Sequence, residues 1–171
     1  MLFALCAMLC SCGYTTGAVL PSDIKTVHVA IFKNSIDITK EISAKDKYEV
    51  YRPNLEVDLR DEIVERFFLD GHLKVAKQGS SGAILTGEIT HYRKAPLRYQ
   101  NEEVREYRIS LVCDFRLMDS SGSEALVEMD QVTGDATYFT TGSLQKSETA
   151  ALTDAMQDLA RRIVNRVVEN W

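Results

Sequence analysis

Apolar residues recur at helical spacing in two segments of the chain. In the first segment, the stripe consists of Leu59, Ile63, Val64, Phe67 and Phe68. Asn54 stands before this segment as an N-cap, and Asp70-Gly71 follows as a stop signal. Acidic residues near the N-terminus of the helix, Glu56, Asp58, Asp61 and Glu62, suit its positive end. The pattern therefore predicts a helix from about residue 55 to 69 whose stripe belongs to the core.

A second helical stripe fills the C-terminal part of the chain. Its members are Leu152, Ala155, Met156, Leu159, Ile163 and Val167. Ser147 precedes the stripe as an N-cap, and Arg161, Arg162 and Arg166 complement the negative end of the helix dipole. We expect a long C-terminal helix from these features.

Between and before the helices, the patterns are those of strands. Residues 24–32 are apolar on both faces, which predicts a strand that is covered on both sides or central in its sheet. Residues 33–53 show no period and predict a long loop. Further strands are predicted at 72–77, 83–92, 104–118 and 125–133, with turns at 79–82 and 119–122. Residues 93–99 are interpreted as a polar loop, and residues 134–139 as the approach to another loop.

The strand at 104–118 has the clearest alternation in the chain. Arg108, Ser110, Asp114 and Arg116 point away from its apolar side, which includes Cys113. The order of strand, helix, antiparallel strands and helix predicts an α+β fold. We expect a two-layer sandwich in which a mostly antiparallel sheet of four to five strands is covered by two helices.

The N-terminus has the features of an export signal. Residues 1–11 are uncharged and mostly apolar, but too short for a membrane-spanning helix. Leu9-Cys10-Ser11-Cys12-Gly13 resembles the bacterial lipobox, in which a small residue precedes the cysteine that is acylated. We therefore expect a signal peptide at 1–11, a lipidated Cys12 with a tether at 12–22, and one domain at 23–171. The alternative is a buried apolar N-terminus with an accidental group of cysteines.

Two further features bear on this expectation. No Lys or Arg precedes Lys25, whereas signal peptides begin with basic residues, so we expect a few basic residues upstream of Met1. After cleavage only Cys12 and Cys113 would remain, and lipidation of Cys12 would leave Cys113 without a disulfide partner. Cys113 is then best interpreted as a small core residue.

Charge and motifs argue against several classes of function. The formal net charge of −5 is unfavourable for binding nucleic acid, although it does not exclude a local basic patch. His28, His72 and His91 lie far apart and lack metal-ligand spacing. The sequence contains neither a Gly-x-Ser-x-Gly nucleophile motif nor a glycine-rich phosphate loop. We expect no catalytic residues, no metal and no cofactor.

One stretch combines basic and aromatic residues, from His91 to Arg108. It contains Arg93, Lys94, Arg98, Arg105 and Arg108, interleaved with Tyr92, Tyr99 and Tyr107. Guanidinium groups suit phosphate recognition, and tyrosines can cover acyl or sugar surfaces. The alternative is an ordinary solvated loop whose charge is neutralised by Glu102, Glu103 and Glu106.

Taken in order, these segments resemble the LPS-assembly lipoprotein family, LptE. The matching segments are Cys12-Gly13-Tyr14, Ile24-Lys25-Thr26-Val27-His28-Val29, the helix Leu55 to Phe68 with Asp70-Gly71-His72-Leu73, Leu85-Thr86-Gly87-Glu88-Ile89, Glu106-Tyr107-Arg108-Ile109 and Asp158-Leu159-Ala160. No single motif is diagnostic, but together they span nearly the whole chain after Cys12.

The resemblance implies a function that is not enzymatic. LptE-like proteins are outer-membrane lipoproteins of Gram-negative bacteria that plug the LptD β-barrel, assist its assembly and bind lipopolysaccharide during export. Gly13 after the acylated cysteine agrees with sorting to the outer membrane, on its periplasmic side. The family's basic contact region would correspond here to Arg93, Lys94 and Arg98. The alternatives are a lipid-anchored scaffold for another envelope complex and, less favoured, a small envelope hydrolase with converging titratable groups.

Overall fold

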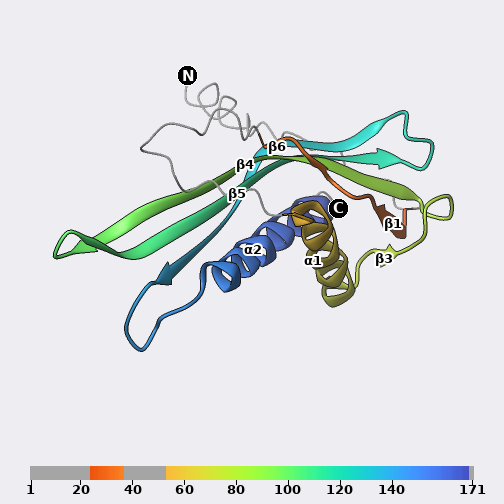
Figure 1. The fold of residues 1–171 in the computed structure, drawn as a ribbon. Helices are drawn as coiled ribbons and strands as arrows, with labels where there is room; N and C mark the ends of the chain where they lie inside the picture. Colours follow the sequence, from red (N-terminus) through yellow and green to blue (C-terminus); the bar gives the residue numbers. More distant parts are fainter. Residues whose placement is uncertain (1–23, 37–52, 170–171) are drawn as a thin grey trace, which may run out of the picture.

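Both helices lie on the same side of one sheet in the computed structural model, which describes residues 24–36 and 53–169 (Figure 1). In chain order the elements are β1 (Thr26–Val29), β2 (Lys33–Asn34), α1 (Leu55–Asp70), β3 (Lys74–Val75), β4 (Ala83–Gln100), β5 (Glu103–Asp119), β6 (Ala125–Phe139) and α2 (Glu148–Val168). The side turned away from the helices is called the distal face of the sheet below. This arrangement confirms the predicted two-layer α+β fold.

The sheet is antiparallel where its strands are long and parallel where they are short. Its order is β3-β1-β4-β5-β6, and β2 also pairs with β4. β4 with β5 and β5 with β6 are antiparallel, whereas β1 with β3, β1 with β4 and β2 with β4 are parallel. β1 is therefore central, as the apolar residues on both its faces predict.

The β4–β5 hairpin projects beyond the rest of the sheet. Pairing with β2 ends at Ile89 on one side of the hairpin, and pairing with β6 ends at Glu106 opposite Phe139 on the other. Residues 91–106 therefore form an arm, which extends past the helix layer in Figure 1. The β5–β6 hairpin projects at the opposite end of the sheet.

The structure corrects two of the predicted loops. Residues 93–99 belong to β4. They pair with β5 in an antiparallel ladder in which Arg93 lies opposite Ser110. Their polar composition conceals the strand because both sides of an exposed arm can carry polar residues. Residues 134–139 likewise belong to β6. Gly134 interrupts the apolar alternation of this strand. A glycine is needed there because α2 packs closely against it: a Cβ atom would lie 2.4 Å from the carbonyl oxygen of Ala155.

The predicted stripe of α1 is narrower in the structure. Leu55, Leu59, Ile63 and Phe67 are buried at the i, i+4 spacing, whereas Phe68 is 70% exposed. The prediction that Phe68 belongs to the core is wrong, because one residue beyond Phe67 lies about 100° further around the helix. Asn54 occupies the N-cap position in a left-handed conformation, but its side chain makes no capping hydrogen bond.

The second helix follows its sequence signals closely. The Ser147 side chain accepts a hydrogen bond from the Ala150 amide at 3.1 Å, as an N-cap residue does. All six predicted stripe residues are buried. Cys113 is also buried in the core, and burial raises the pKa of its thiol to about 12, so the group stays protonated at neutral pH.

Some predictions fall partly or wholly outside the described residues. The signal peptide, Cys12 and the tether do so, as do residues 37–52 of the predicted long loop. The start of that loop is β2 instead, because Lys33 and Asn34 pair with Glu88 and Ile89. Within the described ranges, neither helix has the length and apolar character that crossing a membrane requires.

Candidate functional site

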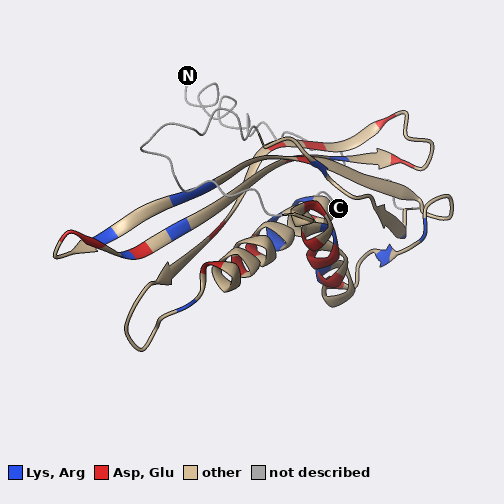
Figure 2. Ribbon diagram, viewed as in Figure 1, with Lys and Arg blue, Asp and Glu red and all other residues tan. Residues whose placement is uncertain are grey.

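The basic residues of the arm divide between its two faces. Figure 2 shows Lys and Arg gathered on the β4–β5 arm. Tyr92 is buried and Lys94 points toward α2, so Arg93 between them lies on the distal face. Three basic residues of the arm that the sequence placed in one stretch therefore do not form one surface.

On the helix side, three side chains converge on the carboxylate of Glu148 in the first turn of α2. Lys94 Nζ lies 2.5 Å from Glu148 Oε2, the Tyr92 hydroxyl donates to Oε1 at 3.1 Å, and the Tyr138 hydroxyl donates to Oε2 at 3.3 Å. A carboxylate at this position also interacts favourably with the positive end of α2. The group, here called the Glu148 cluster, joins β4, β6 and α2.

Aromatic rings enclose the ammonium group of this cluster. Lys94 Nζ lies 4.5 Å from the ring centroid of Tyr107 and 5.9 Å from that of Tyr138, and the two rings stack with centroids 5.6 Å apart. The Lys94 side chain is only 12% exposed. Its position leaves little of the ammonium group available to a ligand.

The electrostatics of the cluster favour its charged form. Burial alone would raise the pKa of the Glu148 carboxyl, but the Lys94 ammonium and the tyrosine hydroxyls outweigh it, so the pKa lies below its ordinary value. Burial would lower the pKa of Lys94, and its hydrogen bonds to Glu148 and Tyr138 raise it instead. Both groups are therefore ionised at neutral pH.

The distal face of the arm, together with the adjoining part of β5, carries exposed guanidinium groups. Arg93 is exposed and lies opposite Ser110, while Arg108 is exposed and lies opposite Ala95, so the two arginines are diagonal neighbours on adjacent strands. Arg98 is 66% exposed in its side chain, 3.5 Å from Glu106, and its guanidinium carbon lies 5.7 Å from the Phe139 ring centroid. We call Arg93, Arg98 and Arg108 the distal arginines.

The structure thus brings two of the three predicted contact residues to one face and places the third on the other. Arg105 is also turned from the distal arginines, because it contacts Thr141 at 3.0 Å and Glu103 at 3.2 Å. The Glu148 cluster was missed from sequence, since Lys94 and Glu148 stand 54 residues apart. A Glu at the first position of a helix was the only local signal.

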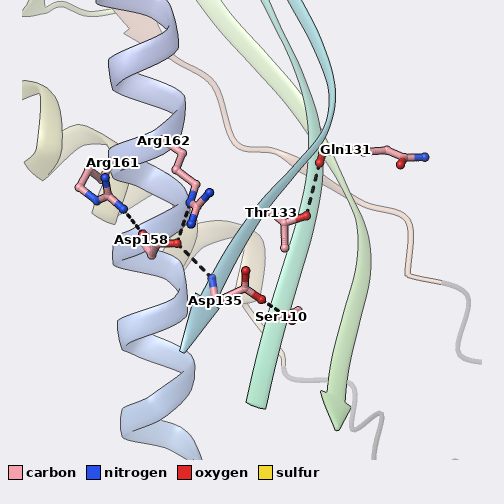
Figure 3. A network of polar contacts seen from close by, with 7 residues as sticks. All are labelled: Ser110, Gln131, Thr133, Asp135, Asp158, Arg161 and Arg162. Atoms are coloured by element: carbon pink, nitrogen blue, oxygen red, sulfur yellow. Dashed lines mark hydrogen bonds and ion pairs between the residues drawn. The ribbon is translucent and has the colours of Figure 1, made fainter. Parts of the chain in front are cut away.

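A second polar network joins α2 to the outer edge of β6 (Figure 3). Asp158 accepts hydrogen bonds from the backbone amide of Asp135 at 3.2 Å and from Arg162 Nε at 2.7 Å, and it also pairs with Arg161. An unpaired amide on an edge strand is a site for unwanted strand pairing, so this contact protects the edge. Asp158 belongs to the Asp158-Leu159-Ala160 segment of the sequence resemblance and has a structural role here.

Two of the histidines make separate local contacts. His28 Nδ1 lies 3.2 Å from the Ala76 carbonyl oxygen, and His72 Nδ1 lies 2.9 Å from Asp70. No three His, Cys, Asp or Glu side chains among the described residues are arranged to hold a metal ion.

One solved structure supports the fold at a TM-score above 0.5, and two others have lower scores. A protein from Xanthomonas campestris superimposes with a TM-score of 0.52 at 16% identity, covering 88% of this chain and 87% of that one. A hypothetical protein from Chlamydia trachomatis has a TM-score of 0.49 at 15% identity, with 84% and 95% covered. The rare lipoprotein B from Shewanella oneidensis has a TM-score of 0.44 at 14% identity, with 83% and 94% covered.

Sequence comparison decides the family. No curated protein sequence matches the chain. The family model described as LptE, lipopolysaccharide-assembly, matches residues 24–167, which include every element from β1 to nearly the end of α2. The resemblance read from the order of the segments is thereby confirmed, and the chain belongs to the LptE family.

Proposed function

We propose that this protein is an outer-membrane lipoprotein that plugs an LptD-like β-barrel, assists its assembly, and binds lipopolysaccharide during export. Membership of a lipopolysaccharide-assembly family carries the proposal. The rare lipoprotein B among the structural relatives agrees in name with a lipoprotein. The proposed role requires binding surfaces and no catalytic group.

The distal arginines are the proposed contacts for lipopolysaccharide. Lipid A carries phosphate groups beside acyl chains, so a contact surface needs cations next to apolar cover. Arg93, Arg98 and Arg108 offer exposed guanidinium groups, and Leu97 and Tyr99 are 42% and 61% exposed on the same arm. Bidentate hydrogen bonding makes guanidinium a good partner for phosphate. Lys94 stays in the proposed set, with a smaller direct share because the Glu148 cluster engages its ammonium group.

The membrane anchor is a separate part of the proposal. Acylation of Cys12 would give at least two chains, and two chains hold a protein stably where one is marginal. Mass spectrometry of the mature protein tests this directly. We expect an N-terminal cysteine that carries diacylglycerol and is preceded by no residue, and an unmodified Cys12 would contradict the anchor.

The lipopolysaccharide contact can be tested without disturbing the Glu148 cluster. We expect the Arg93→Glu and Arg98→Glu double variant to bind lipopolysaccharide at least tenfold more weakly in equilibrium binding to the purified glycolipid. Arg116→Glu is a control for charge reversal at one position, because Arg116 is an exposed arginine on the distal face of the neighbouring strand β5, near the other hairpin. Binding that is equally strong in the double variant and the control would contradict the proposed contact.

The competing function is a scaffold for another envelope complex. Purification of the full chain from detergent-solubilised outer membrane separates the two. Recovery of an LptD-like barrel in stoichiometric amount supports the plug, whereas recovery of other proteins without it supports the scaffold.

A further inference from the structure

Two large apolar side chains stand exposed at the C-terminal end of α1, away from the arm. Phe68 and Leu69 are 70% and 73% exposed. They lie on the side of the helix opposite the buried stripe that contains Leu59 and Ile63, so packing within the described part of the chain does not explain them. Adjacent exposed residues of this size on a helix commonly mark an interaction surface.

The same side of α1 is strongly acidic. At 100° per residue, Asp61, Glu62 and Glu65 share this side with Phe68 and Leu69. Over its whole length α1 has six acidic and two basic residues, which leaves −4 of the formal charge of −5 carried by the chain. Figure 2 shows the concentration of acidic residues on this helix. We call Asp61, Glu62, Glu65, Phe68 and Leu69 the acidic face of α1.

Glu62 shares this acidic environment. Burial raises the pKa of the Glu62 carboxyl and the nearby carboxylates of Glu65, Asp58 and Asp61 raise it further, while a hydrogen bond with Gln157 lowers it. Asp61 is already paired with Arg60 at 2.6 Å, so an added cation would act mainly on Glu62 and Glu65. The acidic face is therefore arranged to gain from a positively charged partner.

A hollow between α1 and α2 adjoins the acidic face. It is lined by Glu62, Glu65, Arg66 and Leu69 from α1, and by Gln157, Asp158, Ala160 and Arg161 from α2. Arg66 Nε is buried, and it has no hydrogen-bond partner among the described residues. Leu69 provides exposed apolar surface beside the hollow, whereas Ala160 is only 1% exposed and Arg66 Nε lies too deep to contact a docked backbone.

These features together select the chemistry of the occupant. Nucleic acids and anionic lipid headgroups are repelled by the carboxylates. A basic polypeptide segment with an apolar side chain matches both parts of the surface: its cations suit the carboxylates, and its apolar side chain covers Phe68 and Leu69.

We propose that the acidic face of α1 docks a basic, apolar segment of the protein partner, on the opposite side of the molecule's sheet from the distal arginines. This inference rests on the proposed function, since the partner is the LptD-like barrel. It assigns different binding surfaces to protein and glycolipid. The barrel contacts a side of α1, and lipopolysaccharide contacts the distal face of the arm.

The test is co-expression of the full chain with the tagged LptD-like barrel from the same organism. Two double variants probe the surface: Phe68→Ser with Leu69→Ser, and Asp61→Lys with Glu65→Lys. We expect the amount of chain recovered per barrel to fall at least fivefold in each, while the thermal unfolding midpoint and lipopolysaccharide binding stay at wild-type values. The charge-reversed variant should also lose the dependence of recovery on salt concentration.

Matched controls change the same residue types elsewhere. Leu144 is 72% exposed and Ile31 is 62% exposed, so Leu144→Ser with Ile31→Ser removes comparable apolar surface. Glu124→Lys with Glu169→Lys makes the same change of charge on exposed residues outside α1. Both controls should recover the barrel within twofold of the wild type.

The outcomes distinguish a failure of the proposed function from a failure of the α1 docking surface. Wild-type chain that recovers no barrel would overturn the proposed function and this inference with it. Wild-type recovery that persists in both α1 variants would overturn the inference alone. A change of self-association in the α1 variants by light scattering, with barrel recovery unchanged, would identify a second copy as the occupant and also overturn it.

Discussion

Lys94 and Arg93 are neighbours in sequence, yet the two faces of the arm give them different roles. Lys94 faces α2 and is held by Glu148 and two tyrosine rings, whereas Arg93 faces away from the helices and is exposed. The alternation of a strand separates them completely. The comparison teaches that a basic stretch in a strand places its charges on two faces. Those facing the helices can stabilise the fold, and those on the distal face stay accessible to a ligand.

The largest expected effect on the free energy of unfolding is at the contact between the helix side of the sheet and α2. A Cβ atom at Gly134 would lie 2.5 Å from Leu159 Cβ and closer still to the Ala155 carbonyl oxygen. Gly134→Ala must therefore displace α2, and we expect it to cost about 2–3 kcal/mol, in the upper part of the range for overpacking. Urea unfolding measures this cost. Thr137→Ala, on the distal face of the same strand, should change the stability by less than about 1 kcal/mol; equal costs would contradict the comparison.

The next largest effect concerns the Glu148 cluster. Lys94→Met and Glu148→Gln should each destabilise the protein by about 1–2 kcal/mol, below the cost of breaking a fully buried pair because the Glu148 side chain is 37% exposed. A double-mutant cycle tests whether the two residues act together. Additive losses would show that Lys94 and Glu148 stabilise the fold independently, against our account.

The same cluster predicts a pH dependence. The pKa of Glu148 is lowered in the folded protein, so the stability that this carboxylate contributes is present above its unfolded value near 4.5. That contribution is lost as the pH falls through the lowered folded pKa. The difference in unfolding free energy between wild type and Glu148→Gln should therefore shrink below about pH 4.5. A difference that stays constant down to pH 2 would exclude the ionised carboxylate as its cause.

The smallest effect on stability is expected on the distal face. Arg93→Gln and Arg108→Gln remove exposed charges, so each should change the unfolding free energy by less than about 0.5 kcal/mol. Lipopolysaccharide binding should nevertheless weaken in both variants. Thermal unfolding and a binding titration on the same samples check the two effects together.

The helices and the long strands were predictable because their buried stripes repeat at a regular period. Ser147, the α2 stripe and the strand around Cys113 lie where the pattern placed them. Residues 93–99 of the arm were not predictable as a strand, because a hairpin that projects beyond the core does not need a continuous apolar face. Phe68 was misassigned to the core because it follows Phe67 directly. The helix buries a stripe only one residue wide at that point, so the next residue is exposed.

The candidate site was predictable in composition but not in geometry. The sequence places Arg93, Lys94 and Arg98 within six residues, and it cannot show that Lys94 is turned toward a residue 54 positions away. Long-range contacts of this kind depend on how α2 crosses the sheet. The position of Gly134 is the local feature that permits the crossing.

The central claim is that the two faces of the arm divide structure from binding. Affinity for lipopolysaccharide, measured for Arg93→Glu with Arg98→Glu and for Lys94→Met with Glu148→Gln, tests it most directly. We predict at least a tenfold loss of affinity in the first pair with unfolding stability unchanged, and less than a threefold loss in the second pair despite its lower stability. The reverse pattern, or equal losses in both pairs, would contradict the claim.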